Sequence, residues 1–252
     1  MRIKNIVIDI DYDETKNFFE RRMKKYKEDN PYSLTMYQDN HPELVRERNA
    51  KEVEIIRPLL KIQNSSKVLD IACGIGRWSD AIVDEIDQYC GLDYCESFIQ
   101  LAKKRNEGLK NRSFFVAKGT EILKCINENA LGKFNTILMM GFFMYLNDSD
   151  LLNVLNQVLE ATEEESIICI REPIGISERL TLKDFYSNEL EDEYNVIYRT
   201  RDELYSYFEL SFLKKGFEIV REGFLFDDAN LNNRKETSQY LFIFERKNNS
   251  FA

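Results

Sequence analysis

Val68-Leu69-Asp70-Ile71-Ala72-Cys73-Gly74-Ile75-Gly76-Arg77-Trp78 is the stretch of this sequence that decides the fold. An apolar run ends in a carboxylate and is followed by a turn with two glycines, Gly74 and Gly76. Glycine has no Cβ, so the chain can adopt positive φ there and pass close to a ligand. Over residues 77–86 apolar side chains recur at helical spacing. The stretch therefore predicts a strand that enters a helix through a glycine turn.

A second acid, Asp93, ends the next apolar run, Tyr89-Cys90-Gly91-Leu92. Its distance from Asp70 just accommodates a strand, a helix and a second strand. In open α/β sheets an acid at the tip of the second strand can accept hydrogen bonds from ribose hydroxyls. Asp93 is the predicted ribose ligand, and the pattern indicates a cofactor that carries a nucleoside.

Two cofactors compete for such a site, a dinucleotide and S-adenosylmethionine. The dinucleotide fingerprint is G-x-G-x-x-G, whereas the corresponding residues here are Ala72, Gly74 and Arg77. Asp70 at the tip of the strand would repel a pyrophosphate, but it could organise a positively charged aminoacyl group. The charges therefore favour the sulfonium cofactor.

At this point the sequence resembles the class I S-adenosylmethionine-dependent methyltransferases. Their glycine motif reads acid, apolar, Gly, x, Gly, x, Gly, and residues 70–76 match it with Ala72 in place of the first glycine. Residues 134–141 resemble the fourth strand of that family, and the resemblance covers about residues 45–245. It implies an α/β fold with a doubly wound, mostly parallel sheet of seven strands, and S-adenosylmethionine as the cofactor.

The same resemblance implies a set of cofactor-binding residues. Most members hold the adenine amine with an acid after the third strand, where this chain has Lys118-Gly119-Thr120-Glu121; we expect backbone amides near Gly119 and the side chain of Thr120 or Glu121 there. An amino-terminal lid implies that Tyr37 and Arg48 close over the carboxylate of the cofactor, with aromatic core packing as the alternative for Tyr37. The expected set is Tyr37, Arg48, Asp70, Ala72, Cys73, Gly74, Gly76, Trp78, Asp93, Tyr94, Gly119, Thr120, Glu121, Met140 and Gly141.

The amino-acid composition restricts the classes of protein to which this chain can belong. The chain has 252 residues, 43% hydrophobic and 31% charged, as expected for a globular protein with one large α/β domain. A formal charge of −9 argues against nucleic acid as a partner. No apolar run reaches the roughly 20 residues of a membrane span, and residues 1–11 do not form a signal peptide. We therefore expect a cytoplasmic protein. We expect it to be a monomer or a homodimer. Five scattered cysteines and one histidine predict reduced thiols and no metal site.

The order of apolar runs predicts the organisation of the chain. Strands are expected near 67–71, 88–92, 113–117, 135–140 and 166–171, and helices near 77–86, 96–105 and 148–160. This alternation predicts a mostly parallel sheet covered on both faces. A helix from His41 to Arg57, a capping box at Thr200 and a terminal hairpin complete the prediction. We expect a helical cover at 1–62 and a core at 63–252, with a substrate-side insertion at 173–199.

Methyl transfer from a sulfonium is an in-line displacement, so the protein mainly aligns the nucleophile and excludes water. An alcohol acceptor would also need a general base, whereas an anionic oxygen would not. His41, the only histidine, and Glu172, at the tip of the fifth strand, are the candidate bases, and Tyr145 is the third catalytic candidate. The alternative role of His41 is helix capping, and that of Glu172 is an ion pair with Arg171.

Arg171 and Arg199 fall where the acceptor is expected, and guanidinium groups suit phosphate or carboxylate oxygens. Solvated surface positions are the alternative for both. The predicted function is methyl transfer to an oxygen of a small acceptor molecule, anionic or linked to a sugar. The chain resembles small-molecule members of the family with an amino-terminal helical cover, which include enzymes that modify sugars of bacterial capsules and other surface polysaccharides. Two other functions stay open: an NAD(P)-dependent oxidoreductase and a non-catalytic S-adenosylmethionine-binding protein.

Overall fold

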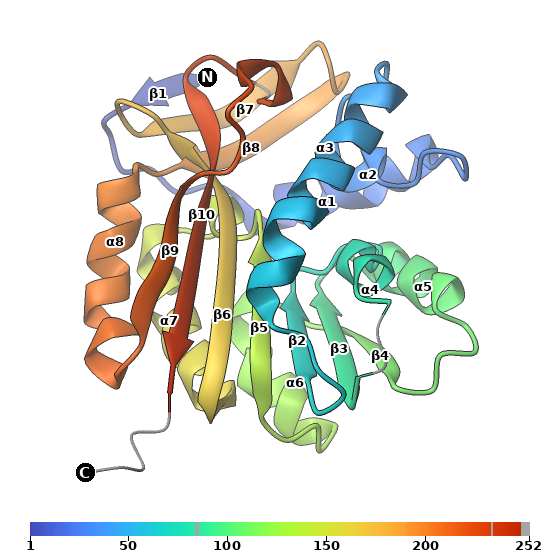
Figure 1. The fold of residues 1–252 in the computed structure, drawn as a ribbon. Helices are drawn as coiled ribbons and strands as arrows, with labels where there is room; N and C mark the ends of the chain where they lie inside the picture. Colours follow the sequence, from blue (N-terminus) through green and yellow to red (C-terminus); the bar gives the residue numbers. More distant parts are fainter. Residues whose placement is uncertain (84–85, 233, 248–252) are drawn as a thin grey trace.

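The structure is a computed structural model that describes residues 1–83, 86–232 and 234–247 (Figure 1). Its strands of the main sheet are β2 (Lys67–Ile71), β3 (Gln88–Asp93), β4 (Arg112–Val116), β5 (Phe134–Met140), β6 (Thr162–Gly175), β9 (Glu218–Phe224) and β10 (Thr237–Arg246). They are ordered β4-β3-β2-β5-β6-β10-β9. The first five run parallel, and β10 is antiparallel to its neighbours β6 and β9. The predicted doubly wound, mostly parallel sheet of seven strands is therefore confirmed.

Helices cover both faces of this sheet, as the alternation of strands and helices predicts. They are α3 (Pro42–Ile56), α4 (Arg77–Ala81), α5 (Glu96–Arg105), α6 (Ile122–Glu128), α7 (Asp148–Ala161) and α8 (Arg201–Leu210). Successive residues of a strand point to opposite faces, so Leu69 and Ile71 of β2 pack in a core with residues of α6, α7 and α8. Val68 instead packs with residues of α3, α4 and α5.

Local sequence signals set several element boundaries. The Thr200 hydroxyl accepts from the Glu203 amide at 3.2 Å, and the Glu203 carboxylate accepts from the Thr200 amide at 2.8 Å, which is the predicted capping box. After α8, the short helix η5 (Leu213–Lys215) ends at Gly216 in the left-handed region, with φ 81°. The predicted terminal hairpin is formed by β9 and β10 at the edge of the sheet.

The amino-terminal segment and the predicted insertion form a second layer at one end of the sheet (Figure 1). This layer contains β1 (Arg2–Lys4), α1 (Tyr12–Arg22), η1 (Met23–Lys25), α2 (Ser33–Met36), β7 (Leu180–Ser187) and β8 (Asp192–Tyr198). β1, β7 and β8 pair as a three-stranded antiparallel sheet. The division into a cover at 1–62, a core at 63–252 and an insertion at 173–199 stays a prediction.

Two local expectations differ from the structure. The predicted strands do not include β1, β7 and β8, because charged residues interrupt their apolar patterns and because β1 pairs with a strand that is distant in the sequence. The helix expected at 77–86 is α4, which ends at Ala81; residues 84 and 85 of that range lie outside the described residues.

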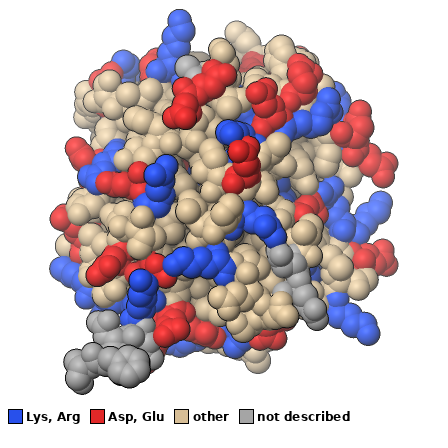
Figure 2. Space-filling view, in the orientation of Figure 1, with Lys and Arg blue, Asp and Glu red and all other residues tan. Residues whose placement is uncertain are grey.

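The surface carries both signs of charge. Figure 2 shows Lys and Arg interspersed with Asp and Glu over the visible face. Among the described residues, no helix combines the length and apolarity that crossing a bilayer requires.

Candidate functional site

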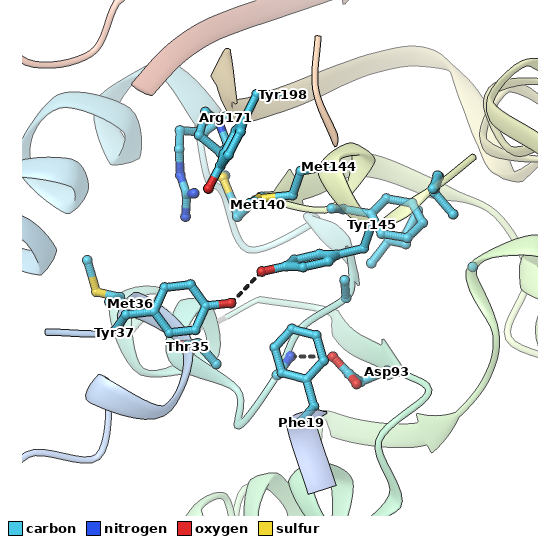
Figure 3. A pocket seen from close by; sticks show the side chains of 18 of the residues that line it. Phe19, Thr35, Met36, Tyr37, Asp93, Met140, Met144, Tyr145, Arg171 and Tyr198 are labelled. Atoms are coloured by element: carbon cyan, nitrogen blue, oxygen red, sulfur yellow. Dashed lines mark hydrogen bonds between the residues drawn. The ribbon is translucent and has the colours of Figure 1, made fainter. Parts of the chain in front are cut away.

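A large cavity lies where the ends of the parallel strands meet the second layer (Figure 3). In open α/β sheets, ligands bind beyond the carboxyl ends of the strands. The cavity is lined by residues from the loops after β2, β3, β4 and β5, from β6, from α1 and α3, and from the segment around α2. Twelve of the predicted site residues line it: Tyr37, Arg48, Ala72, Gly74, Asp93, Tyr94, Gly119, Thr120, Met140, Gly141, Tyr145 and Arg171.

The glycine turn and Asp93 form one hydrogen-bonded unit of this cavity. Gly74 has φ 56°, and a Cβ there would lie 2.8 Å from the Thr35 side chain, so only glycine fits without a shift. The Gly74 amide donates to Asp93 Oδ2 and the Cys95 amide to Asp93 Oδ1, each at 2.9 Å (Figure 3 draws the first). Each carboxylate oxygen keeps a lone pair for a ligand hydroxyl. Burial raises the pKa of Asp93 to about 6, against the opposing effect of these amides.

Asp70, in contrast, does not line the cavity. It is 1% exposed and accepts a hydrogen bond of 2.5 Å from the Tyr89 hydroxyl. Burial raises its pKa to about 7. The structure therefore does not bring Asp70 and Asp93 together as a carboxylate pair facing one ligand.

Four other predicted cofactor residues also lie outside the lining: Cys73, Gly76, Trp78 and Glu121. Gly76 is the residue before α4, and Trp78 lies in the first turn of α4 with its side chain buried in the core. Cys73 is buried in the same core. Glu121 ends the short helix η3 (Gly119–Glu121), with its carboxylate 3.7 Å from the ammonium group of Lys124.

Buried cations gather at the α3 side of the cavity. Arg77 binds Glu52 at 2.6 Å, and Arg171 lies 3.3 Å from the same carboxylate. Burial disfavours ionisation of Glu52, but Arg171 and Arg77 hold its pKa below the ordinary value. Arg48, one turn earlier on α3, is 4% exposed; its Nε has no hydrogen-bond partner, and it forms no ion pair with the described residues. Arg77 and Arg171 thus share one carboxylate, and Arg48 lies near them without an ion pair among the described residues, which leaves positive charge for an anionic ligand.

Tyrosine hydroxyls cross the middle of the cavity. The hydroxyl of Tyr37 contacts that of Tyr145, which lies 2.9 Å from the hydroxyl of Tyr194 (Figure 3 draws the first contact). Burial raises the pKa of Tyr37 to about 12 and that of Tyr145 well above its ordinary value. These hydroxyls are therefore neutral at pH 7 and act as donors and acceptors rather than as bases.

Tyr37 is held in an unusual backbone conformation. Its φ is 63° and that of Gln38 is 62°, which is strained for residues other than glycine. The Gln38 amide donates to Glu189 Oε1 at 3.0 Å, and the Arg22 guanidinium lies 5.1 Å from the centre of the Tyr37 ring. These contacts keep the Tyr37 hydroxyl over the cavity.

The two candidate bases do not face the cavity. His41 is 63% exposed in its side chain and lies just before α3, with Nδ1 3.8 Å from Glu43. Glu172 is 1% exposed, and its carboxylate accepts from the amides of Phe142 at 2.5 Å, Phe143 at 2.7 Å and Met144 at 3.3 Å. Burial raises the pKa of Glu172 to about 7. Its lone pairs are used to hold the turn after β5.

Arg199 is placed in the same turn rather than in the cavity. Its guanidinium donates to the carbonyls of Phe143 at 2.7 Å and Leu146 at 2.6 Å and to Asp148 at 2.8 Å. The turn contains the short helix η4 (Phe143–Tyr145). Arg199 and Glu172 thus fix the loop that carries Tyr145 into the cavity.

Among the lining residues that sequence reasoning missed are Glu189, Tyr194, Tyr198 and Arg234. The three from the insertion lie in a segment whose polar and aromatic composition is visible in the sequence, but their orientation depends on the β7–β8 pairing. Arg234 has no local sequence signal. Within the described ranges, no group of His, Cys, Asp and Glu side chains could hold a metal ion.

Comparison with known proteins gives one family match. Residues 68–165 match the model of the family described as "Methyltransferase domain". Two curated proteins of Triticum aestivum are similar: phosphoethanolamine N-methyltransferase, 24% identical over 149 residues (59% of this chain and 29% of that protein), and phosphoethanolamine N-methyltransferase 1, 24% identical over 155 residues (61% and 30%). The chain thus spans less than a third of the length of these relatives.

Solved structures share the fold over nearly the whole chain. Phosphoethanolamine N-methyltransferase 1 of Haemonchus contortus, in complex with phosphoethanolamine and S-adenosylhomocysteine, aligns with a TM-score of 0.69 and 16% identity, over 96% of this chain and 50% of that chain. Magnesium protoporphyrin IX methyltransferase of Synechocystis, with bound S-adenosylmethionine, aligns with a TM-score of 0.60 and 14% identity, over 96% and 100%. The structural similarity confirms the predicted fold. The family match over residues 68–165 agrees with the predicted methyltransferase class of this domain. The curated relatives are phosphoethanolamine rather than sugar methyltransferases.

Proposed function

We propose that this protein transfers the methyl group of S-adenosylmethionine to a small acceptor molecule. The observation that carries the proposal is a single cavity that joins the Gly74–Asp93 unit to the buried guanidinium of Arg48, which has no ion-pair partner among the described residues. A ribose with two hydroxyls and an amino acid with a free carboxylate would satisfy both groups at once.

The residues present fit that cofactor. Asp93 accepts from the ribose hydroxyls, and Gly74 allows the backbone to approach the ligand. Arg48 would bind the carboxylate, because it forms no ion pair among the described residues, whereas Arg77 and Arg171 share Glu52. Gly119 and Thr120 also line the cavity and would hold the adenine. Tyr37 closes the cavity from the cover, as proposed for a lid.

The cofactor supplies an electrophilic methyl group on a sulfonium. The protein aligns the acceptor with it and excludes water. Phe19 packs edge-on against Tyr145, with ring centres 5.1 Å apart, so aromatic groups from the cover and from the loop after β5 enclose the centre of the cavity. The neutral hydroxyls of Tyr37 and Tyr145 can orient an acceptor without taking its proton.

The acceptor atom is proposed to be an oxygen or a nitrogen, on a metabolite that is anionic or linked to a sugar. A neutral alcohol needs a general base, and Glu172 is hydrogen-bonded to three backbone amides while His41 lies outside the lining. An anionic oxygen or an amine that arrives unprotonated needs no such base. This arrangement, together with the N-methyltransferase relatives, supports nitrogen as the second candidate.

Methyl transfer is tested with tritiated methyl donor and a panel of acceptors: phosphoethanolamine, ethanolamine, sugar phosphates, nucleotide sugars and a metabolite extract. We expect label in a small product, and the same rate for His41→Ala as for the unchanged protein. Calorimetry with S-adenosylhomocysteine provides the binding control. Failure to bind it would overturn the proposal, and binding without transfer to any acceptor would support the non-catalytic alternative. Binding of NADH in its place would favour the oxidoreductase.

A further inference from the structure

A second group of polar residues lies at another part of the same cavity. Tyr198 at the end of β8 and Arg234 both line it, and the guanidinium of Arg234 is hydrogen-bonded to the Tyr198 hydroxyl. In Figure 3, Tyr198 and Arg171 lie on one side of the Tyr37–Tyr145 contact and Asp93 lies on the other. The cavity thus extends beyond the part assigned to the adenosyl group.

The positive charge of Arg234 has no anionic partner in contact. Arg199 is bound to Asp148, and Arg171 is shared with Glu52, but Arg234 forms no ion pair with the residues that the structure describes. It contacts the Tyr198 hydroxyl, and its guanidinium carbon lies 5.9 Å from the centre of the Phe185 ring. A half-buried cation that is not paired costs free energy, which an anionic ligand would recover.

Glu189 is the acid on the cavity wall whose charge is felt by Arg234. It is also felt by Arg48 and by Tyr198, and one of its oxygens is engaged by the Gln38 amide. Glu189 therefore acts on two guanidinium groups, those of Arg48 and Arg234, and among the described residues it forms an ion pair with neither.

The donors on the Arg234 side of the cavity suit a phosphate group. The Arg234 guanidinium is a planar fork, the Tyr198 hydroxyl adds a donor, and Arg171 reaches the same side. Guanidinium groups bind phosphate oxygens in pairs, and several donors from separate elements match the three terminal oxygens of a phosphate monoester better than the two of a carboxylate.

We infer that the acceptor is a phosphate monoester whose phosphate is bound by Arg234 and Tyr198. This inference rests on the proposed function. The phosphate anchors one end of a short acceptor on the Arg234 side, and the other end extends toward Tyr145 and Met140, which line the cavity between the strands and the cover. Arg234 and Tyr198 then determine specificity, while the adenosyl group depends on Asp93 and Arg48.

The test is titration of inorganic phosphate into the full chain loaded with S-adenosylhomocysteine, which occupies the groups assigned to the cofactor. The variant is Arg234→Gln, and the matched control is Lys235→Gln, the exposed neighbouring cation. We expect phosphate to bind the unchanged protein and the control equally, and Arg234→Gln to bind it at least tenfold more weakly. Tyr198→Phe should lose a smaller factor.

If each variant binds S-adenosylhomocysteine as tightly as the unchanged protein does, the variant is folded. The cofactor site of the proposed function is then intact, whatever the outcome for phosphate. The inference is overturned if the unchanged protein does not bind phosphate, if Arg234→Gln binds it as well as the control does, or if acetate binds as tightly as phosphate. Loss of S-adenosylhomocysteine binding by the unchanged protein would instead contradict the proposed function itself. A second arm compares phosphoethanolamine with ethanolamine as competitors of bound phosphate, and only the former should compete.

Discussion

Some residues of the site are placed to contact a ligand, and others hold those residues in position. Asp93 could be predicted as a ribose ligand because the acid, the strand before it and the glycine turn are all visible in the sequence. Asp70 is also an acid at the end of an apolar run, yet its carboxylate is buried and accepts a hydrogen bond from the Tyr89 hydroxyl. Glu172 looks like a base at a strand tip, but three amides of a turn distant in the sequence bind it. Such non-local partners could not be read from residues alone.

Asp93 sets the pH dependence of cofactor affinity. Its pKa in the free protein is raised to about 6 by burial, so the carboxylate becomes protonated as the pH falls through 6 and loses its strength as an acceptor for ribose hydroxyls. We expect affinity for S-adenosylhomocysteine to fall about tenfold from pH 7 to pH 5, measured by calorimetry. In Asp93→Asn the affinity should be weaker at pH 7 and nearly independent of pH. An equally steep pH profile in that variant would contradict this role.

Asp70 sets a pH dependence of stability. Its folded pKa of about 7 lies above the unfolded value of about 3.9, so the free energy of unfolding falls as the pH rises from about 4 to 7. Asp70→Asn removes the buried charge and can still accept from Tyr89. We expect it to be more stable than the unchanged protein at pH 8, by about 2–4 kcal/mol, with little difference at pH 4.5. Urea denaturation at both values measures this, and a gap that is larger at the lower pH would refute it.

Glu172 holds the turn after β5. Glu172→Ala leaves the amides of Phe142, Phe143 and Met144 without their acceptor, and we expect the free energy of unfolding to fall by about 3 kcal/mol. His41→Ala, at an exposed position, should change it by less than about 0.5 kcal/mol. Urea denaturation measures both. Normal stability of Glu172→Ala together with lost methyl transfer would show instead that Glu172 is a catalytic base.

Among the secondary-structure elements, the parallel strands and the helices between them could be predicted because each has its own apolar run or cap. β2 is buried on both faces, and α7 repeats apolar residues on one side. β1, β7 and β8 could not be predicted, because charged residues interrupt their apolar patterns and because β1 pairs with β7, which lies more than a hundred residues away in the sequence. α4 is shorter than its apolar pattern suggests and ends at Ala81.

The cover is an element whose stability depends on Arg22. This guanidinium is 2% exposed and donates to the carbonyls of Leu34 at 3.0 Å and Ser33 at 2.6 Å and to Asp39 at 2.6 Å. It therefore ties α1 to the segment that carries Tyr37. We expect Arg22→Met to increase amide hydrogen exchange in residues 33–39 and to speed release of S-adenosylhomocysteine about tenfold.

Arg21→Met is the matched control for that change, since Arg21 lies next to Arg22 on α1 and binds Asp192, away from the α2 segment. It should leave exchange in residues 33–39 unchanged. Equal exchange and equal release rates in the two variants would mean that Arg22 does not position the cover.

At the scale of the whole molecule, the cavity exists only where three parts of the chain meet. The strand ends supply Gly74 and Asp93, the amino-terminal segment supplies Tyr37 and Arg48, and the region after β6 supplies Tyr198 and Arg234. The glycine motif in the sequence predicts the contribution of the strand ends, and the family resemblance predicts that of the amino-terminal segment. The third depends on how β7, β8 and the turn before β10 pack, which no local pattern specifies.

The central claim is that one cavity holds the adenosyl cofactor between Asp93 and Arg48. A crystal structure of the full chain with S-adenosylhomocysteine tests it most directly. The account predicts ribose hydroxyls on the Asp93 carboxylate, the amino-acid carboxylate on the Arg48 guanidinium, and the sulfur facing the Tyr37–Tyr145 contact. A ligand bound elsewhere, or bound in this cavity with Asp93 and Arg48 both turned away from it, would contradict the account.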